Sequence, residues 1–458
     1  MGEGIVERNW LDLSLAQQAV WLDAKLNGNM ILQLGGWSRI PARLEEAYVR
    51  QAMSLVMARH DALRLRVDND RPRQWLDSSI EAPLRISPLP DSYDVDEAFR
   101  LYLQQYIRLP MPLGDHPLFG LELVEAGDNA CYLIWRFHHL IADSVSTSLA
   151  MQYWTEAYLA LTTDEPRELS PPTSYLPGIE ADKEYLASTE YKQDLAYWVA
   201  RFTPLPPPLV VDDRETDETG IFFADWTLSG ELWECLQKLA SDIKIAPFRI
   251  LFAIFAAVSA EHYGQSDLVT AMALHRRDQS SRLTLGMFSG VMPVRFYVAS
   301  GKSFLETVQG YSAQIDADLR HKRIPVDHLA RVLELFRHGR SRLFDIVMSF
   351  LPADRVRNHS VDDEWSIRSG VVAVSEASPI SLHVTELDSM GLQIRVSVNT
   401  RIVDPSAAEA LLSRMQYAVR SSAHAPNISV DHLFSGHLKE HATVESRDSN
   451  LSREEWIV

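Results

Sequence analysis

Two adjacent histidines, His138 and His139, are followed by Asp143 in the stretch FHHLIADSVS. An imidazole titrates near neutral pH, so either histidine can accept or deliver a proton once its position and tautomer are fixed. A nearby carboxylate is a common support for such a residue. The same pattern is also typical of two histidines that end a strand, one buried and one solvated. These residues alone leave proton-transfer chemistry and a structural role open.

The sequence lacks the signatures of several other enzyme classes. The stretch SGKS at 300–303 resembles the end of a phosphate-binding loop, but Phe296 stands where that loop needs its first glycine. No GxGxxG, HExxH or GxSxG pattern occurs, which disfavours dinucleotide-binding, zincin and α/β-hydrolase enzymes. The other histidines are scattered, and their spacing predicts no metal site.

Length and composition limit the class of protein. A chain of 458 residues predicts two or three domains, and its formal net charge is -18. A nucleic-acid partner is disfavoured because its phosphates require a concentrated positive surface. The two cysteines, Cys131 and Cys235, form no CxxC pair. We therefore expect neither a disulfide framework nor a structural zinc site, and a reducing, cytoplasmic location fits.

Membrane insertion is not expected from the sequence. The N-terminal MGEGIVERNW has no basic start followed by an apolar run, so it does not resemble a secretory signal. The most apolar stretch, FRILFAIFAAVSAEHY, is shorter than the roughly 20 residues that span a bilayer. It follows Pro247, a residue that suits the first turn of a helix. This stretch predicts a buried core helix.

The histidine pair is placed by a strand and a helix. The run CYLIWRF is continuously apolar, as expected of a strand buried on both faces, and it ends at His138. A helix is predicted over 144–161, so Asp143 lies in the turn between the two elements. Residues 44–59 carry apolar side chains at helical spacing and predict a second helix that packs one face inward.

A change of composition divides the chain. Residues 164–178 are rich in Pro, Ser and Glu, which predicts a linker and a domain boundary near Gly178. A helical run over 180–202 follows, and the chain after Phe434 is polar and linker-like. Each half is predicted to be a mixed α/β sandwich. The second half contains five strand-like runs: IFFADWTL, DLVTAMAL, VMPVRFYV, FDIVMSF and GLQIRVSV.

The pattern HHxxxD followed by a small residue resembles the signature of the condensation domains of non-ribosomal peptide synthetases. Chloramphenicol acetyltransferase and related CoA-dependent acyltransferases share it more loosely. Further stretches similar to the family's motifs occur in the family's order and cover residues 10–434: LSLAQQAVWL, RHDALRLRV, YLASTEYKQDLAYW, LGMFSGVMPVR, HKRIPVDHL and GRSRLFDIVMSF.

The resemblance implies an α/β fold of two chloramphenicol acetyltransferase-like subdomains. They would form a V-shaped pseudo-dimer with the active site at their junction. The expected division is 1–177 for the subdomain that carries HHxxxD, 178–434 for the second subdomain, and 435–458 for a linker-like tail. The resemblance further implies a monomer that binds no cofactor of its own, because carrier proteins deliver its substrates as thioesters of phosphopantetheine.

The resemblance also implies an activity and residue roles. Such a domain forms an amide bond between a donor acyl or peptidyl thioester and an acceptor amine. His139, as the second histidine, would be the catalytic one, and His138 would shape the turn. Asp143 would pair with an arginine, for which we select Arg64. Gly286 and Phe288 belong to a motif of the substrate channel.

Two positions depart from the family's pattern. Ser144 stands where glycine is usual after Asp143; it still supplies a backbone N–H for an oxyanion, but its side chain adds bulk. Gly290 stands where the channel motif has asparagine, which puts the shape of the channel in doubt more than the chemistry. Both histidines are intact, so we expect an active enzyme.

Alternatives remain open at this level. The chain could be an acyltransferase that uses a CoA or carrier thioester with a free hydroxyl or amine, or an inactive platform that recruits carrier proteins. An epimerisation domain is disfavoured because DSVSTSL lacks the tryptophan and arginine typical of that subgroup. We expect a free-standing enzyme, a starter domain that acylates the first amino acid, or an excised fragment.

The segment 320–342 concentrates positive charge in an acidic chain. A solvated helix face is the favoured interpretation. The alternative is a contact patch for an acidic carrier protein, where opposite charge would speed encounter. The basic residues are Arg320, Lys322, Arg323, Arg331, Arg337, Arg340 and Arg342.

Overall fold

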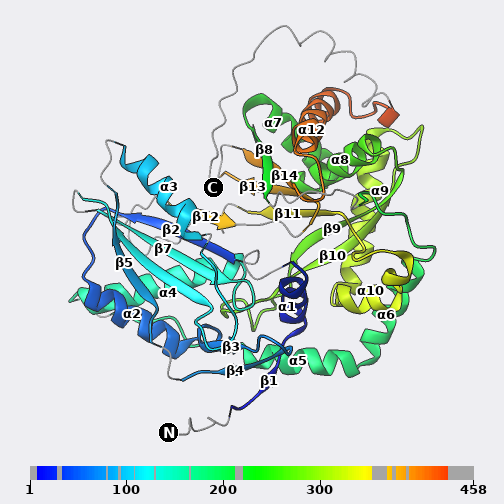
Figure 1. The fold of residues 1–458 in the computed structure, drawn as a ribbon. Coiled ribbons are helices and arrows are strands. Elements are labelled where there is room, and N and C mark those ends of the chain that lie inside the picture. Colours follow the sequence, from blue (N-terminus) through cyan, green and yellow to red (C-terminus); the bar gives the residue numbers. More distant parts are fainter. Residues whose placement is uncertain are drawn as a thin grey trace.

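The computed structural model of the chain contains two groups of elements, each built on its own sheet (Figure 1). In Figure 1 the first group, blue to cyan, lies to the left, and the second, green to orange, lies to the right. The residues that the structure describes are 8–27, 33–78, 81–90, 94–107, 109–127, 130–164, 167–211, 220–352, 369–373, 378–387 and 391–431.

The first group is a five-stranded sheet in the order β12-β2-β7-β6-β5, beside a small sheet in the order β1-β4-β3. Strand β5 is parallel to β6, and the other neighbours in the large sheet are antiparallel. The strands are β1 (Leu11–Asp12), β2 (Gln33–Ile40), β3 (Leu65–Val67), β4 (Arg73–Leu76), β5 (Leu84–Pro88), β6 (Phe119–Glu125), β7 (Cys131–His138) and β12 (Ser369–Ala373). The helices are α1 (Leu15–Asn27), α2 (Glu46–Arg59), α3 (Val95–Ile107) and α4 (Ser144–Thr162).

Strand β7 is the centre of this group because both of its faces are covered. On one face, Trp135 packs edge-on against Trp154 of α4 with 6.0 Å between ring centroids. On the other face, Tyr132 stacks on Phe99 of α3 at 3.7 Å. Double coverage explains why the sequence of β7 is continuously apolar rather than alternating. The predicted strand and the helix after it are confirmed, and α4 begins at Ser144 as expected.

The second group is a six-stranded sheet in the order β10-β9-β11-β13-β14-β8. Strand β11 is parallel to both of its neighbours, and the other pairs are antiparallel. The strands are β8 (Ile221–Leu228), β9 (Asp267–His275), β10 (Ser289–Tyr297), β11 (Ile346–Leu351), β13 (Ile380–Glu386) and β14 (Leu392–Asn399). The helices are α5 (Leu176–Ala187), α6 (Thr189–Arg201), α7 (Gly230–Ile243), α8 (Pro247–His262), α9 (Phe304–Asp318), α10 (Val326–Val332) and α12 (Ser406–His424).

Helix α8 is the central helix of the second core, and every residue over 250–260 is buried. The sequence prediction of a buried core helix is therefore confirmed. Within the described residues, no single helix has both the length and the apolar character to cross a membrane. Helices α7 and α8 meet that test only when taken together, and they are bent by 100° relative to each other.

Two segments that connect strands of the second group are built into the first group. Strand β12 follows β11 of the second sheet along the chain, yet it pairs with β2 of the first sheet, from Ser369 opposite Ser38 to Ala373 opposite Leu34. Leu285 and Met287, between β9 and β10, are buried in the first hydrophobic core. The segments that leave the second group therefore complete the first.

Sequence patterns located some strands and missed others. The five strand-like runs of the second half correspond to β8, β9, β10, β11 and β14. Strand β2, with the sequence QLGGWSRI, was missed because glycines weaken a strand signal. Gly35 is required there, since a Cβ atom at this position would lie 2.1 Å from the carbonyl oxygen of Trp135. The predicted boundary at Gly178 falls in the first turn of α5.

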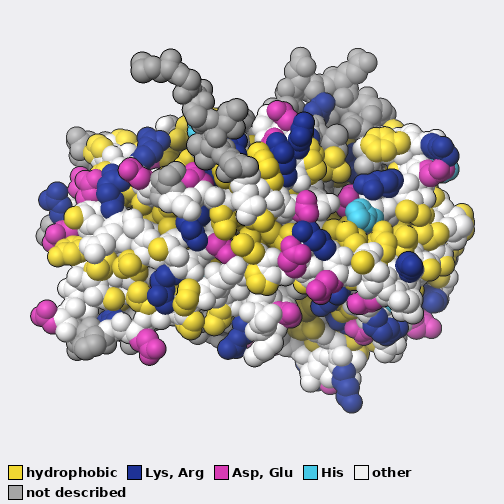
Figure 2. Space-filling model, turned by 90° about the horizontal axis from the view of Figure 1, so that it is seen from below, with side chains coloured by type: hydrophobic (Ala, Val, Ile, Leu, Met, Phe, Trp, Pro, Cys, Tyr) yellow, Lys and Arg dark blue, Asp and Glu magenta, His cyan; other side chains and the backbone are white. Residues whose placement is uncertain are grey.

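The surface mixes both signs of charge. Figure 2 shows Lys and Arg side chains interspersed with Asp and Glu on the face seen from below, with no extended patch of one sign. A nucleic-acid surface requires a concentrated positive field. The interspersed charges give no such field on this face. The predicted tail at 435–458 lies outside the described residues.

Candidate functional site

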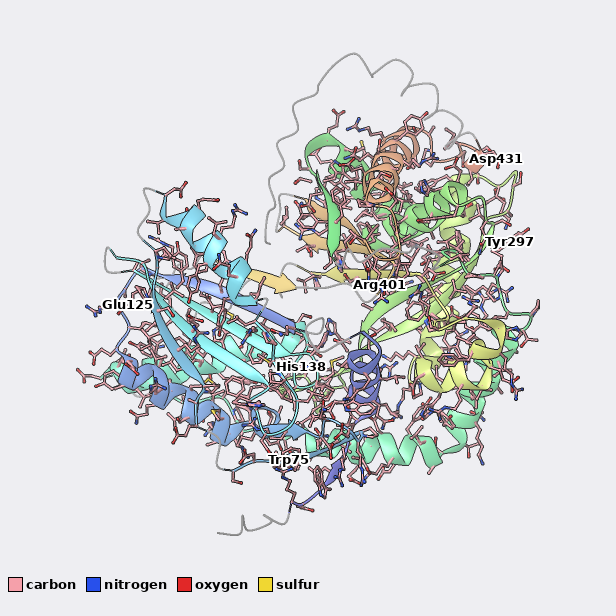
Figure 3. All side chains as sticks on the ribbon, viewed as in Figure 1. Trp75, Glu125, His138, Tyr297, Arg401 and Asp431 are labelled. Carbon is pink, nitrogen blue, oxygen red and sulfur yellow. The ribbon has the colours of Figure 1, made fainter. Side chains whose placement is uncertain are left out.

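The histidine pair begins where β7 ends, close to the second group of elements (Figure 3). His138 is fully buried, and its Nδ1 accepts the backbone N–H of Leu140 at 3.1 Å. Burial, with a smaller contribution from His139, lowers the pKa of His138 to about 3. His138 is therefore neutral near physiological pH, and its ring holds the turn that follows the strand.

His139 is oriented by a hydrogen bond within the same turn. Its Nδ1 lies 2.9 Å from the carbonyl oxygen of Ala142, and the side chain is only partly buried. A carbonyl oxygen can only accept, so Nδ1 carries the hydrogen. In the neutral ring the lone pair is then on Nε2. This is the tautomer that a base acting through Nε2 requires.

Asp143 caps helix α4 and has no exposed surface. Its Oδ1 accepts the backbone N–H of Ser146 at 2.9 Å. Its Oδ2 accepts from the guanidinium of Arg277, from the N–H of Phe288 at 3.1 Å and from the hydroxyl of Ser289 at 3.2 Å. Burial raises the pKa of Asp143, but the charge and hydrogen bonds of Arg277 and the N–H of Ser146 outweigh it, so the net pKa is lowered. Asp143 is therefore a buried carboxylate.

The prediction that Arg64 pairs with Asp143 was wrong, because the ion pair is formed by Arg277. Arg64 ends a short 3₁₀ turn beside β3; its carbonyl accepts the N–H of Asp77 at 2.9 Å, and its buried Nε has no partner among the described residues. Arg277 is the second residue after β9, 134 residues from Asp143 along the chain. The only local signal for it was an arginine at the end of a predicted strand.

Arg277 also fixes the segment between β9 and β10. Its Nη2 donates to the hydroxyl of Ser146 at 2.8 Å and to the carbonyl of Thr284 at 3.1 Å. The Ser146 hydroxyl in turn donates to the carbonyl of Gly286 at 2.7 Å and accepts its N–H at 3.0 Å. The guanidinium lies 4.4 Å from the ring centroid of Phe288. One arginine thus holds this segment against the first turn of α4.

Gly286 and Phe288, predicted channel residues, pack against Tyr175. A Cβ atom at Gly286 would lie 2.1 Å from the Tyr175 ring, so this close approach excludes any side chain. Phe288 meets the same ring edge-on at 5.0 Å. The Tyr175 hydroxyl donates to the carbonyl of Met287 at 2.6 Å, and the hydroxyl of Ser14 lies 2.6 Å from it. The tyrosine therefore connects the opening motif with the channel motif.

The opening motif supports the histidine turn directly. Gln17, fully buried in α1, donates from Nε2 to the carbonyl of Leu140 at 2.9 Å. The opening motif LSLAQQAVWL contains Ser14 and Gln17, but the sequence alone assigned neither residue a role. Tyr175, Ser146 and Arg277 were missed altogether, since their partners lie more than 100 residues away along the chain.

Ser144 and Gly290 occupy different surroundings. Ser144 is the first residue of α4, where backbone N–H groups lack intrahelical partners. Gly290 leaves room for Arg276: a Cβ atom at 290 would lie 2.9 Å from the Arg276 Nε. Burial lowers the pKa of Arg276, whose Nη2 donates to the carbonyl of Ile324 at 3.4 Å. An arginine therefore occupies the space beside the glycine.

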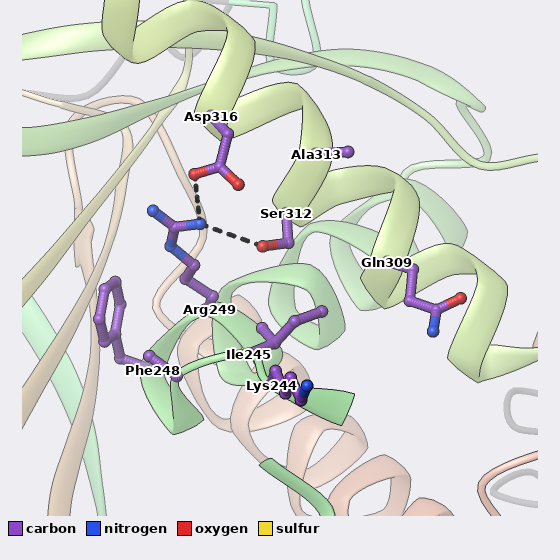
Figure 4. A pocket seen from close by; sticks show the side chains of 9 residues that line it. Lys244, Ile245, Phe248, Arg249, Gln309, Ser312, Ala313 and Asp316 are labelled. Atoms are coloured by element: carbon purple, nitrogen blue, oxygen red, sulfur yellow. Dashed lines mark hydrogen bonds and ion pairs between the residues drawn. The ribbon is translucent and has the colours of Figure 1, made fainter. Parts of the chain in front are cut away.

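In the described part of the chain, no three His, Cys, Asp or Glu side chains are grouped so that they could hold a metal ion. A cavity of about 480 Å³ lies between α8 and α9 (Figure 4). Across it Arg249 donates to Ser312 at 3.1 Å and to Asp316 at 2.7 Å. The cavity shares no residue with the histidine turn.

Comparison with known proteins finds a matching family model and similar proteins. The model of the family described as "Condensation domain" matches residues 7–441. Surfactin synthase subunit 1 of Bacillus subtilis (strain 168) is 22% identical over 440 residues, covering 93% of this chain and 12% of that protein. Phosphinothricin tripeptide synthetase PhsC of Streptomyces viridochromogenes is 26% identical over 436 residues, covering 90% and 39%. The chain thus spans less than half of either relative.

Solved structures share the fold. A mutant of the starter condensation domain of rhizomide synthetase RzmA, in complex with C8-CoA, has a TM-score of 0.79 at 22% identity, covering 92% of this chain and 96% of that chain. The first condensation domain of the calcium-dependent antibiotic synthetase, in complex with a substrate analogue, has a TM-score of 0.76 at 22% identity, covering 92% and 98%. The predicted fold class is therefore confirmed.

Removing either member of the buried ion pair should destabilise the protein. Breaking a buried pair on one side costs about 3–5 kcal/mol, because a charge is left without its partner. We expect the free energy of unfolding of Asp143→Ala and of Arg277→Ala to fall by about that amount, as measured by denaturant unfolding. Arg64→Ala, which breaks no ion pair with Asp143, is the matched control and should lose less than half as much. A fully stable Asp143→Ala protein would contradict the prediction.

A side chain at Gly290 should conflict with Arg276. We expect Gly290→Asn to lower the melting temperature, because its Cβ atom meets the Arg276 Nε below contact distance. The double variant Gly290→Asn with Arg276→Ala should recover part of the loss, since the second change removes the obstructing group. Calorimetry on the two single variants and the double variant measures the coupling. Additive losses would show that the two positions do not interact.

Proposed function

The chain belongs to the condensation domain family, and we propose that it forms an amide bond between a thioester-bound acyl or peptidyl donor and an amine acceptor. The observation that carries this proposal is the geometry of His139. Its Nδ1 is committed to the Ala142 carbonyl, which leaves Nε2 to act on a substrate. Attack of an amine on a thioester is favourable overall, so the enzyme must mainly position the reactants and remove protons.

His139 contributes to both requirements in this proposal. Its Nε2 accepts a hydrogen bond from the attacking nitrogen and holds the lone pair of that nitrogen against the thioester carbonyl. Positioning of this kind can lower a barrier by several kcal/mol. As the C–N bond forms, Nε2 takes the proton from nitrogen and returns it to the departing sulfur. General-base help of this kind is worth a factor of roughly a hundred or more.

The groups around His139 would serve the same step indirectly. Asp143 is held by Arg277 and therefore fixes the end of the turn that carries the histidine. The backbone N–H of Ser144, at the N-terminus of α4, is the proposed donor to the oxyanion that develops on the thioester carbonyl. A helix N-terminus carries partial positive charge, which favours a developing anion.

Membership of the family supports a role for carrier proteins in delivering the substrates. We propose that peptidyl or acyl carrier proteins bring donor and acceptor on phosphopantetheine arms, while the domain binds no cofactor of its own. The proposed division of the chain is 1–177, 178–434 and 435–458, and a hydrophobic core that lies wholly within the second segment supports it. We further propose that the protein is a cytoplasmic monomer without nucleic-acid or membrane partners. The net charge of -18 supports the absence of a nucleic-acid partner.

A starter-type reaction is the second candidate. In it the donor is a fatty or other acyl group on CoA or a carrier, and the product is an acylated amino acid. The TM-score of 0.79 to a starter condensation domain solved with C8-CoA supports this candidate. Ester formation with a hydroxyl acceptor, and a role as a carrier-recruiting platform, are the remaining alternatives.

Only part of the basic segment is available to a carrier protein. Arg340 is buried and donates to the carbonyl of Pro206 at 2.6 Å, and Arg342 pairs with Asp345 at 3.0 Å. By contrast, an exposed group at the end of α10 combines two arginines with apolar side chains. This carrier patch consists of Arg331, Val332, Phe336 and Arg337.

The composition of the carrier patch supports docking of an acidic partner. Phe336 is 81% exposed and Val332 is 47% exposed, which is unusual for side chains of this kind. Arg331 pairs with Asp327 at 3.9 Å and Arg337 with Glu334 at 2.6 Å, but both arginine side chains remain 76% exposed. Exposed aromatic residues and arginines are enriched in protein interfaces. We therefore propose that this patch, rather than the whole basic segment, contacts a carrier protein.

Condensed product should form in an intact-mass assay with acyl-loaded and aminoacyl-loaded carrier proteins. We expect His139→Ala to lower the yield by a factor of roughly a hundred while its melting temperature is unchanged. His116→Ala, which changes an exposed histidine outside the site, is the matched control and should remain active.

Two other outcomes would redirect the assignment. Product from free amines and acyl-CoA without any carrier would favour the stand-alone acyltransferase. Carrier binding without product from any donor and acceptor would favour the recruiting platform.

Reversing charge in the carrier patch should weaken carrier binding. We expect Arg331→Glu with Arg337→Glu to reduce the association rate at least tenfold at low salt, because steering by opposite charge is lost. The wild-type rate should fall with added salt, and the variant's rate should not. Surface plasmon resonance with a loaded carrier measures both. Arg43→Glu, an exposed site in the first group, is the control. A wild-type rate independent of salt would reject the patch.

A further inference from the structure

The residues that lead into α5 are held by the stretch RHDALRLRV, which begins at Arg59, the last residue of α2. Arg59 donates from Nη2 to the carbonyl of Ser170 at 2.6 Å. Asp61 is 8% exposed, and its Oδ1 accepts the backbone N–H of Tyr175 at 2.8 Å. Its Oδ2 accepts from the hydroxyl of Ser174. The segment that was predicted to be a linker is therefore fixed to the first half.

Asp61 fixes a tyrosine that bonds the channel motif. The main chain of Tyr175 is held by Asp61, and its side-chain hydroxyl donates to the carbonyl of Met287 at 2.6 Å. The residue after Met287 is Phe288, whose N–H is donated to Oδ2 of Asp143 at 3.1 Å. Asp143 ends the turn that carries the catalytic histidine. One continuous path of contacts therefore leads from Asp61 to Asp143.

His60 supports a second tyrosine of the same kind. Its buried ring stacks on Tyr153 of α4 with 4.4 Å between ring centroids and 3° between ring planes. Its Nδ1 lies 2.9 Å from the hydroxyl of Thr173. Burial, and to a lesser degree the charge of Arg59, lowers the pKa of His60 to about 4, so the ring is neutral near physiological pH. The Tyr153 hydroxyl donates to the carbonyl of Leu283 at 2.6 Å. Neighbouring residues of one motif thus support both tyrosines.

The two tyrosine hydroxyls hold the segment 283–287 at both of its ends. Between these points Arg277 donates to two further carbonyls of the segment. Loss of an end contact therefore frees the part of the segment nearest to it, and the N–H that Phe288 donates to Asp143 shifts with that part. A misplacement of about 1 Å near a reacting group can lower a rate by roughly a hundredfold. The geometry of the histidine turn thus depends on contacts made far from it.

We propose that Asp61 and His60 are positioning residues for the reaction. Through the two tyrosines they set where the channel motif delivers its hydrogen bonds to Asp143, and thereby where the His139 turn ends. Neither residue contacts the substrate in this role, so its loss slows the chemical step and leaves the binding of carrier proteins unchanged. This inference rests on the proposed amide-forming function and extends it to residues outside the histidine turn.

The test compares single-turnover rates of variants with acyl-loaded and aminoacyl-loaded carrier proteins. We expect Asp61→Ala to lower the rate at saturating carrier at least tenfold, and to leave the carrier concentration at half-saturation within about twofold of wild type. Asp61→Asn should bring the rate back to within about threefold of wild type, because its amide oxygen still accepts the N–H of Tyr175. Tyr175→Phe should reproduce the defect of Asp61→Ala. His60→Ala and Tyr153→Phe form the corresponding pair, with the same expected pattern.

A double variant tests whether Asp61 acts through Tyr175. Asp61→Ala combined with Tyr175→Phe should be within about twofold of the slower single variant, since both changes release the same contact. Tyr311→Phe is the matched control, because it removes a buried hydroxyl that lies 3.1 Å from the hydroxyl of Thr270 in the second core. It should lose stability without losing rate. If Asp61→Ala does not fold, Tyr175→Phe decides the question, because it removes a single oxygen atom.

Amide hydrogen exchange gives a measurement that does not depend on activity. The N–H of Phe288 is protected by its bond to Asp143. We expect this amide to exchange at least tenfold faster in Asp61→Ala and in Tyr175→Phe than in wild type, because the segment that carries it opens locally. Its exchange should be unchanged in Tyr311→Phe. Mass spectrometry of peptides that contain Phe288 measures the rates, and melting temperatures of all variants report on folding.

The outcomes are distinguishable. Absence of product from the wild-type protein would reject the proposed function itself, and unchanged exchange at Phe288 would reject the path of contacts whether or not the protein is active. With an active wild type, an equal loss of rate in Tyr311→Phe would show that lowered stability alone causes the defect, and would reject the positioning role. Additive losses in the double variant, or a loss confined to carrier binding, would reject it as well. A slower saturating rate that Asp61→Asn restores, with faster exchange at Phe288, establishes it.

Discussion

A carboxylate with no exposed surface has to find all of its partners inside the protein, and Asp143 finds them in both groups of elements. One oxygen caps α4, and the other receives Arg277, the N–H of Phe288 and the hydroxyl of Ser289. The desolvation of such a group is offset only when these donors arrive together. The histidine turn can therefore hold its conformation only when the β9–β10 segment is docked on it.

The remaining contacts of the site reinforce this docking. Ser146 and Tyr175 bond the backbone around Gly286 from the first half, and Gln17 holds the carbonyl of Leu140 from α1. The opening motif, the histidine motif and the channel motif thus meet at one turn. His139 belongs to the first half, and its turn ends at Asp143, whose ion pair with Arg277 reaches the second half.

Local patterns predicted the elements that carry the chemistry, and the family comparison confirmed the resemblance read from the motifs. Strand β7 and helix α4 were predictable because a doubly buried strand and a helix after a capping aspartate leave strong signals. The partner of Asp143 was not predictable, because 134 residues separate it from Arg277 and no local spacing encodes that contact. Arg64 was a reasonable choice by motif, but the fold directs the carboxylate elsewhere. The hydrogen bonds from Phe288 and Ser289 to Asp143 depend on how the second sheet is placed against the histidine turn, which sequence periodicity does not determine.

Strand β12 has a consequence beyond joining the two sheets. It covers the outer side of β2, whose backbone N–H and C=O groups would otherwise form an unpaired edge open to other chains. If the two halves moved apart far enough to remove β12, that edge would become a template for aggregation. Small separations that keep the hydrogen bonds between β12 and β2 intact would not expose the edge to aggregation. The crossing strand thus couples separation of the two halves to exposure of the β2 edge, and it opposes wide separation independently of any substrate.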